Sequence, residues 1–178
     1  EDGTIDEVEA ERMLDHAIES GVTYIDTAYP YHDGESEPFV GRVLKKYKRE
    51  DFYLATKLPM FKIDSLEQAK EIFEEQIKRL DVDYVDFYLL HALNKDTWKK
   101  VIDLNIIPYC EELKKQGRIK NFGFSFHDDY EVFEQKFEDY LALADGTEIS
   151  TEEIGKLLKE VTAIINSIED SVIYSKTN

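Results

Sequence analysis

Four short apolar segments recur along the first two thirds of the chain, and stretches with helical periodicity separate them. These strand-like segments cover residues 22–28, 51–58, 84–93 and 119–126. A polar residue stands at or near the end of each segment: Asp26, Lys57, His91 and Ser125. The spacing between these polar residues is 31, 34 and 34 residues. Strands rich in β-branched and aromatic residues that are joined by long helices are typical of parallel βαβ units, so we expect an α/β fold with a parallel sheet.

Two α/β architectures fit this repeat. A (β/α)8 barrel of about 250 residues devotes roughly 31 residues to each βα unit, which is close to the spacing found here. A doubly wound open sheet shows the same alternation, but no G-x-G-x-x-G turn follows any of the four segments. We therefore predict a partial (β/α)8 TIM barrel with four recognisable βα units. Eight such units need about 260 residues, whereas the chain has 178.

The stretches between the segments carry start and stop signals of helices. The predicted helices cover residues 6–20, 36–48, 65–80 and 98–116. The first has Val8 and Met13 on its apolar face and ends at Gly21, and the third begins with Ser65 as its N-cap. We expect the fourth to be interrupted at Pro108, because proline removes a backbone donor from a helix interior.

The repeat stops after residue 126. Two further helical patterns follow, over residues 129–144 and 150–167, and the second has a strong apolar stripe. No segment of the earlier strand type lies between Ser125 and Ser171. We therefore predict a half-barrel over residues 1–134 and a helical C-terminal tail over residues 135–178.

Charge and cysteine content limit the classes of partner. The formal net charge is −17, which argues against a nucleic acid or an anionic membrane surface as the main partner. The single cysteine, Cys110, cannot form an internal disulfide, and no apolar run approaches the ~18 residues of a membrane span. We expect a cytoplasmic protein. We expect no metal site, because His32-Asp33 lacks a second ligand pair and residues 145–155 only partly follow a calcium-loop pattern.

Ionisable residues gather where the predicted strands end. Asp26, Lys57 and His91 each end a different strand, and Tyr31 lies in the loop after the first. Function in parallel sheets and barrels concentrates at the carboxyl ends of the strands, so we expect these side chains to share one site. A free tyrosine has a pKa near ~10 and is a poor acid at neutral pH, but a neighbouring ammonium stabilises the phenolate. A carboxylate can hold that ammonium, and a histidine can bind the substrate oxygen. The group therefore predicts proton donation to a carbonyl.

The motifs around these residues resemble those of the aldo-keto reductases. The chain reads D-T-A-x-x-Y from Asp26 to Tyr31, then Y-x-x-G-x-S-E, A-T-K, L-L-H and G-F-S-F, in the family's order, over residues 6–128. The resemblance implies a (β/α)8 barrel and NADPH- or NADH-dependent reduction of a small-molecule carbonyl compound. It implies that Tyr31 is the general acid, that Lys57 and Asp26 adjust its acidity and that His91 orients the carbonyl.

The resemblance also implies that Ser125 contacts the nicotinamide carboxamide of the cofactor. The family's usual asparagine beside this serine is replaced by Phe126. The family's first strand has no counterpart in this sequence, and the elements of its sixth to eighth strands that hold the dinucleotide phosphates are not found after Gln135.

Two functional hypotheses follow. The first is an oxidoreductase of the aldo-keto reductase type, an enzyme once the remaining strands are present in the full polypeptide. The alternative is a non-catalytic barrel remnant or interaction module that lacks a complete cofactor site. Because both edges of a half-barrel sheet are open, self-association through these edges is a further expectation.

Overall fold

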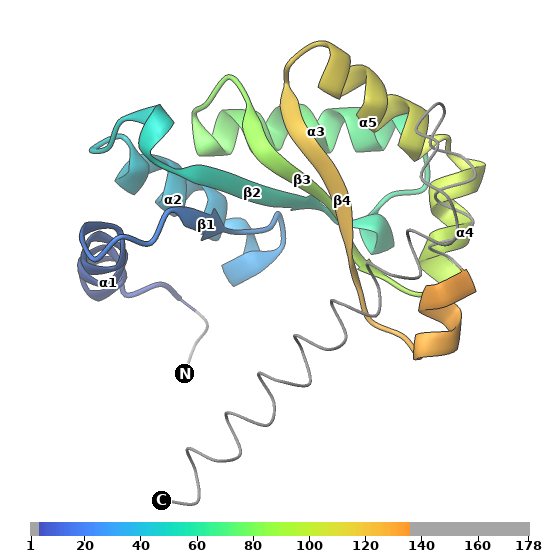
Figure 1. Ribbon diagram of the computed structural model, residues 1–178, viewed down its shortest axis with the longest axis horizontal. Helices are drawn as coiled ribbons and strands as arrows, with labels where there is room; N and C mark the ends of the chain where they lie inside the picture. Colours follow the sequence, from blue (N-terminus) through green and yellow to red (C-terminus); the bar gives the residue numbers. More distant parts are fainter. Residues whose placement is uncertain (1–3, 136–178) are drawn as a thin grey trace, which may run out of the picture. The chain divides into compact units, whose positions relative to one another are not determined.

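A four-stranded parallel sheet forms the centre of the computed structural model, which describes residues 4–135 of the 178-residue chain (Figure 1). The strands are β1 (Tyr24–Asp26), β2 (Tyr53–Leu58), β3 (Val85–Leu93) and β4 (Ile119–Phe126). They lie in the order β1-β2-β3-β4, and all three pairs are parallel. The four predicted strands are confirmed.

The strand order separates the two candidate architectures. A doubly wound sheet reverses its strand order at a switch point, whereas each described strand here lies beside the next one in sequence, as in a barrel. Helices α2 and α3 both run behind the strands in Figure 1, on one face of the sheet. The described part is therefore a segment of an α/β barrel, as the repeat predicts.

Helix α1 precedes the first strand, and four helices and three 3-10 turns lie between the strands. The helices are α1 (Glu7–Glu19), α2 (Ser36–Leu44), α3 (Leu66–Leu80), α4 (Lys95–Asp103) and α5 (Ile106–Lys115). The 3-10 turns are η1 (Tyr31–Gly34), η2 (Arg49–Asp51) and η3 (Met60–Lys62). Ser65 caps α3 as predicted, because its Oγ accepts from the amide of Gln68 at 3.2 Å. Gly21 follows the end of α1 with φ +96°, which a residue with a Cβ adopts at a cost.

The core lies between the sheet and the helices on one face. Alternate residues of the strands point into it, among them Leu54, Leu58, Tyr88 and Leu90, all almost fully buried. The ring of Phe73 on α3 meets that of Tyr88 edge-on, with ring centroids 5.1 Å apart. Burial of each such side chain contributes about 1.5–3 kcal/mol, so this layer fixes the position of the strands that carry the site.

The fourth predicted helix is interrupted at a different residue from the one expected. The helix is interrupted at Asn105 rather than at Pro108, because Asn105 has φ +55° and separates α4 from α5. Pro108 is the third residue of α5. The first four amides of a helix have no intrahelical partner, so proline is tolerated there.

Polar side chains link helix α1 to the region after α2. Val8 and Met13 are 83% and 59% exposed. Asp15 instead accepts hydrogen bonds from Lys46 and Tyr47, both at 2.6 Å. The predicted helix is confirmed, and Val8 and Met13 on its apolar face are exposed.

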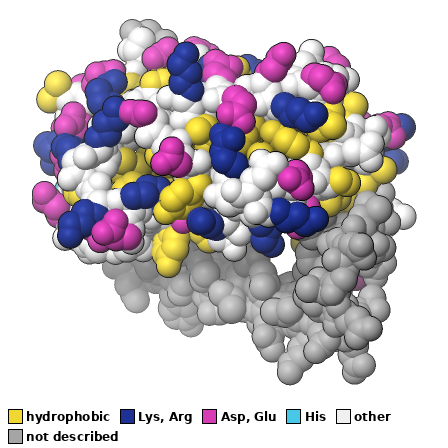
Figure 2. Space-filling view, turned by 90° about the horizontal axis from the view of Figure 1, so that it is seen from above, with side chains coloured by type: hydrophobic (Ala, Val, Ile, Leu, Met, Phe, Trp, Pro, Cys, Tyr) yellow, Lys and Arg dark blue, Asp and Glu magenta, His cyan; other side chains and the backbone are white. Residues whose placement is uncertain are grey.

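Charge is spread over the surface seen in Figure 2. Lysine and arginine side chains alternate on this face with aspartate and glutamate, and hydrophobic side chains lie between them. Among the described residues, no helix is both long and apolar enough to cross a membrane.

The predicted helix from residue 129 begins at Tyr130, and its continuation lies outside the described residues. The helix predicted over 150–167 and the tail over 135–178 lie outside them as well, so the division at residue 134 stays a prediction.

Candidate active site

The carboxyl ends of neighbouring strands bring three of the predicted residues to one edge of the sheet. Asp26 is the last residue of β1, Lys57 the next to last of β2, and His91 lies near the end of β3. The ladders pair Asp26 with Ala55 and Lys57 with Leu89, so each of the three residues lies two positions further along its strand than the partner of the one before it.

Lys57 is the central cation of this group. Its side chain is only 7% exposed, and its ammonium donates to Asp26 Oδ1, to the carbonyl of Thr27 at 2.9 Å and to the hydroxyl oxygen of Tyr31 at 3.3 Å. An ammonium has three N–H donors, and these three acceptors use all of them. The position of the charge is therefore held by its neighbours.

Tyr31 begins the 3-10 turn after β1. Its amide donates to the carbonyl of Ala28 at 3.1 Å, and His32 and Asp33 follow it in the left-handed region, with φ +51° and +55°. This tight turn places the phenol beside Lys57 while leaving the side chain 39% exposed. Because the phenol oxygen accepts from Lys57, its own proton remains available for a ligand.

His91 faces Tyr31 from β3. The two rings meet edge-on with centroids 5.7 Å apart. Burial lowers the pKa of His91 below its ordinary value, and the charges of Lys57 and His127 lower it further. Its Nδ1 is buried and has no hydrogen-bond partner among the described residues. A neutral imidazole carries one N–H, and this N–H can bind a substrate oxygen.

Ser125 joins the group through the backbone next to His91. The β3–β4 ladder is irregular between Leu90 and Leu93, and Ala92 there has φ +53°. The Ala92 amide donates to Ser125 Oγ at 2.8 Å. The serine hydroxyl therefore keeps its own hydrogen for another acceptor. Phe126, next to Ser125, packs against Phe133 with ring centroids 5.3 Å apart and belongs to an aromatic cluster.

Phe61 also lies beside the candidate site, although the sequence patterns did not predict it there. It lies on η3, after the strand that carries Lys57, and its ring is 5.8 Å from that of His91 while remaining half exposed. The available signal was an aromatic residue in the loop directly after a strand with a site residue.

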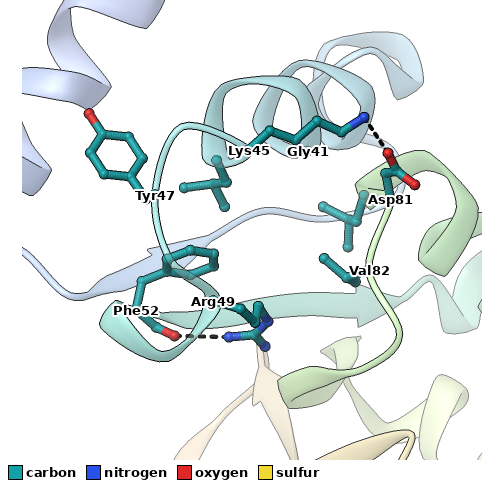
Figure 3. A pocket seen from close by; sticks show the side chains of 9 residues that line it. Gly41, Lys45, Tyr47, Arg49, Phe52, Asp81 and Val82 are labelled. Atoms are coloured by element: carbon teal, nitrogen blue, oxygen red, sulfur yellow. Dashed lines mark hydrogen bonds and ion pairs between the residues drawn. The ribbon is translucent and has the colours of Figure 1, made fainter.

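A cavity of about 130 Å³ lies near the opposite, amino ends of the strands (Figure 3). Two cations line it, and both are engaged by protein groups: Lys45 pairs with Asp81, and Arg49 donates to the carbonyl of Phe52 at 3.0 Å. Within residues 4–135, no group of three His, Cys, Asp or Glu side chains could hold a metal ion. The reactive groups thus converge at the carboxyl ends.

The chain is similar to a family of known proteins. Residues 1–170 match the family model described as the aldo/keto reductase family. An uncharacterized oxidoreductase YqkF of Bacillus subtilis is 37% identical over 122 residues, which cover 64% of this chain and 38% of the relative. The methylglyoxal reductase YeaE of Escherichia coli is 34% identical over 108 residues, covering 61% of this chain and 36% of that protein.

Solved structures agree. An aldo-keto reductase of Bacillus halodurans in its holo form gives a TM-score of 0.58 at 36% identity and covers 69% of this chain and 43% of its own. An aldo-keto reductase of Klebsiella pneumoniae in complex with NADPH gives a TM-score of 0.63 at 27% identity and covers 77% and 46%. The chain thus spans less than half the length of these relatives. The family match runs to residue 170, well past the predicted limit at residue 128.

Proposed function

The chain belongs to the aldo/keto reductase family, and from that premise we propose that it carries the proton-donating centre of a nicotinamide-dependent carbonyl reductase. The observation that carries the proposal is the ammonium of Lys57, which contacts both the carboxylate of Asp26 and the phenol of Tyr31. The proposed substrate is a small carbonyl compound.

In the proposed reaction, Tyr31 donates its proton to the carbonyl oxygen of the substrate. The charge of Lys57 stabilises the phenolate that forms, and Asp26 holds Lys57 in place. His91, neutral because of its lowered pKa, donates an N–H to the same oxygen and orients it. With a hydride added to the carbonyl carbon, the product is the alcohol.

A reduced nicotinamide cofactor supplies that hydride when bound. Ser125 fits the carboxamide of this group, because its hydroxyl accepts from Ala92 and retains a hydrogen to donate. We propose NADPH as the first cofactor to test, since a structural relative binds it, with NADH as the comparison.

The experiment measures oxidation of NADPH by the purified full chain with methylglyoxal, the substrate in the name of a relative. We expect turnover in the wild type and a loss of about 100- to 10,000-fold in Tyr31→Phe, with similar cofactor affinity. Equal turnover in both proteins would remove Tyr31 as the acid. If the wild type neither turns over nor binds millimolar cofactor, as followed by fluorescence, the result instead supports the non-catalytic interaction module.

We further propose that copies of the chain associate through the outer strands. Among the described strands, β1 pairs only with β2 and β4 only with β3. The outward peptide groups of such strands are available for pairing. Light scattering after gel filtration would show a dimer or larger species, and a monomer over the whole concentration range would refute the proposal.

We propose a cytoplasmic location as well, because Cys110 is a buried free thiol of the kind found in reducing compartments.

A further inference from the structure

A fully buried polar network lies on the helix side of β2, directly behind Lys57. It consists of Glu37 on α2, Thr56 on β2, Gln76 on α3 and Tyr88 on β3, all with no exposed surface. Glu37 Oε1 accepts from Thr56 Oγ1 at 2.6 Å and from Gln76 Nε2 at 2.8 Å. The hydroxyl of Tyr88 donates to Gln76 Oε1 at 2.8 Å. Both ends of the Gln76 amide are therefore held.

One contact of this network leads to the candidate active site. Gln76 Nε2 also donates to the backbone carbonyl of Lys57 at 3.0 Å. Ala55, two residues earlier on β2, accepts from the amide of Thr27, the residue that follows β1. Peptide groups two residues apart face the same neighbouring strand, so the carbonyl of Lys57 points past the end of β1. Because β1 ends at Asp26, it offers no amide to this carbonyl, and the side chain of Gln76 donates the hydrogen bond instead.

The burial of the Glu37 carboxylate in this network costs free energy of folding. Burial raises the pKa of Glu37, and hydrogen bonds from Thr56 and Gln76 and the charge of Arg79 offset this only in part. Arg79 Nη1 lies 3.4 Å from Glu37 Oε2. Apolar residues in such places often stabilise a protein as well or better. A buried carboxylate kept beside the strand that carries Lys57 points to a role in that residue's placement.

We propose that Gln76, held by Glu37 and Tyr88, positions Lys57 for its contact with Tyr31. This inference rests on the proposed reductase function. The ammonium of Lys57 reaches Tyr31 at 3.3 Å, near the limit of a hydrogen bond, so a small movement of the Lys57 backbone breaks the contact. Gln76, Glu37 and Tyr88 are thus positioning residues, since they act on the reacting phenol through Lys57.

The test uses Gln76→Met in the full chain, which keeps the length of the side chain and removes its hydrogen bonds. The first readout is the ¹H–¹⁵N NMR signal of the Lys57 ammonium, assigned with Lys57→Arg. This signal is visible while the ammonium protons are held in hydrogen bonds. We expect it to broaden or vanish in Gln76→Met. The second readout is kcat for carbonyl reduction, which we expect to fall roughly 10- to 100-fold, with the KM of the cofactor unchanged.

Asp86→Asn is the matched control. Asp86 is a buried charge near the amino end of β3 that pairs with Arg49 and accepts from the amide of Leu54 at 2.9 Å. The substitution perturbs a buried polar group away from the site, so we expect the Lys57 signal and kcat to stay as in the wild type. An equal loss in Asp86→Asn would overturn the inference, because the effect would then be one of general stability.

Tyr88→Phe is the milder second variant if Gln76→Met does not fold. It removes only the hydroxyl that holds Gln76, and we expect a smaller change of the same kind. An unchanged Lys57 signal in a folded Gln76→Met or Tyr88→Phe protein would overturn the inference. The signal is measured without turnover, so an inactive wild type contradicts the proposed function and leaves the positioning test intact.

Discussion

Gly41 on α2 lies against the backbone at the end of α3, and this contact allows a quantitative prediction. A Cβ added at Gly41 would lie 2.5 Å from the carbonyl oxygen of Leu80, 2.7 Å from its carbonyl carbon and 2.8 Å from the carbonyl oxygen of Arg79. Ordinary contact begins at 3.4 Å, so the helices must separate by 3.4 − 2.5 = 0.9 Å at this point. The obstacle is backbone and cannot rotate away.

Two opposing terms set the size of the effect of Gly41→Ala. Alanine in a helix interior is favoured over glycine by about 1 kcal/mol. Overpacking of a close-packed contact costs about 1–3 kcal/mol. The rigid obstacle places the cost at the upper end, so we expect the free energy of unfolding to fall by about 2 kcal/mol.

Urea unfolding of the full chain, followed by the fluorescence of the buried Trp98, measures this difference. Gly123→Ala is the matched control, because its Cβ would meet only the movable Cδ2 of Leu89 at 3.3 Å. We expect the control to lie within about 1 kcal/mol of the wild type. A Gly41→Ala protein as stable as the wild type would refute the argument that α2 and α3 meet backbone to backbone.

Two further predictions concern a titrating group and a backbone conformation. The pKa of His91 in the folded protein is lowered from 6.5, so on acidification the unfolded chain binds the proton first. The contribution of His91 to the free energy of unfolding is therefore fully present above pH 6.5 and is lost as the pH falls through the folded pKa. An NMR titration should give His91 a midpoint below 6.5, and a midpoint above it would contradict the burial. At Asn105, whose φ is +55°, Asn105→Ala should lose about 1–2 kcal/mol while Asn105→Gly should not; equal stability of the two variants in urea would be evidence against the left-handed break.

Local patterns in the sequence were sufficient to place the strands and three of the candidate site residues. An apolar run ended by Asp26, Lys57 or His91 predicts both a strand and the end at which the side chain appears. Parallel pairing then brings these ends together whatever the details of the helices. Neighbouring groups at the site could thus be predicted, although their distances could not.

Features that depend on the meeting of distant segments were not predictable. Only the packed fold shows the amide of Gln76 against the carbonyl of Lys57. Proline is the usual signal for a helix break, whereas the break occurs at Asn105, which tolerates the left-handed conformation. Phe61 approaches His91 only because η3 folds back over the end of β3.

If Lys57 acts through Tyr31, the two side chains are coupled in turnover, and a double-mutant cycle measures this coupling. Tyr31→Phe, Lys57→Met and the double variant are compared with the wild type for kcat with NADPH and methylglyoxal. Residues that act as one unit have non-additive effects. Coupling of this kind predicts that the double variant is no slower than Tyr31→Phe alone. Losses that multiply, with the double variant slower by the product of the two single effects, would contradict it.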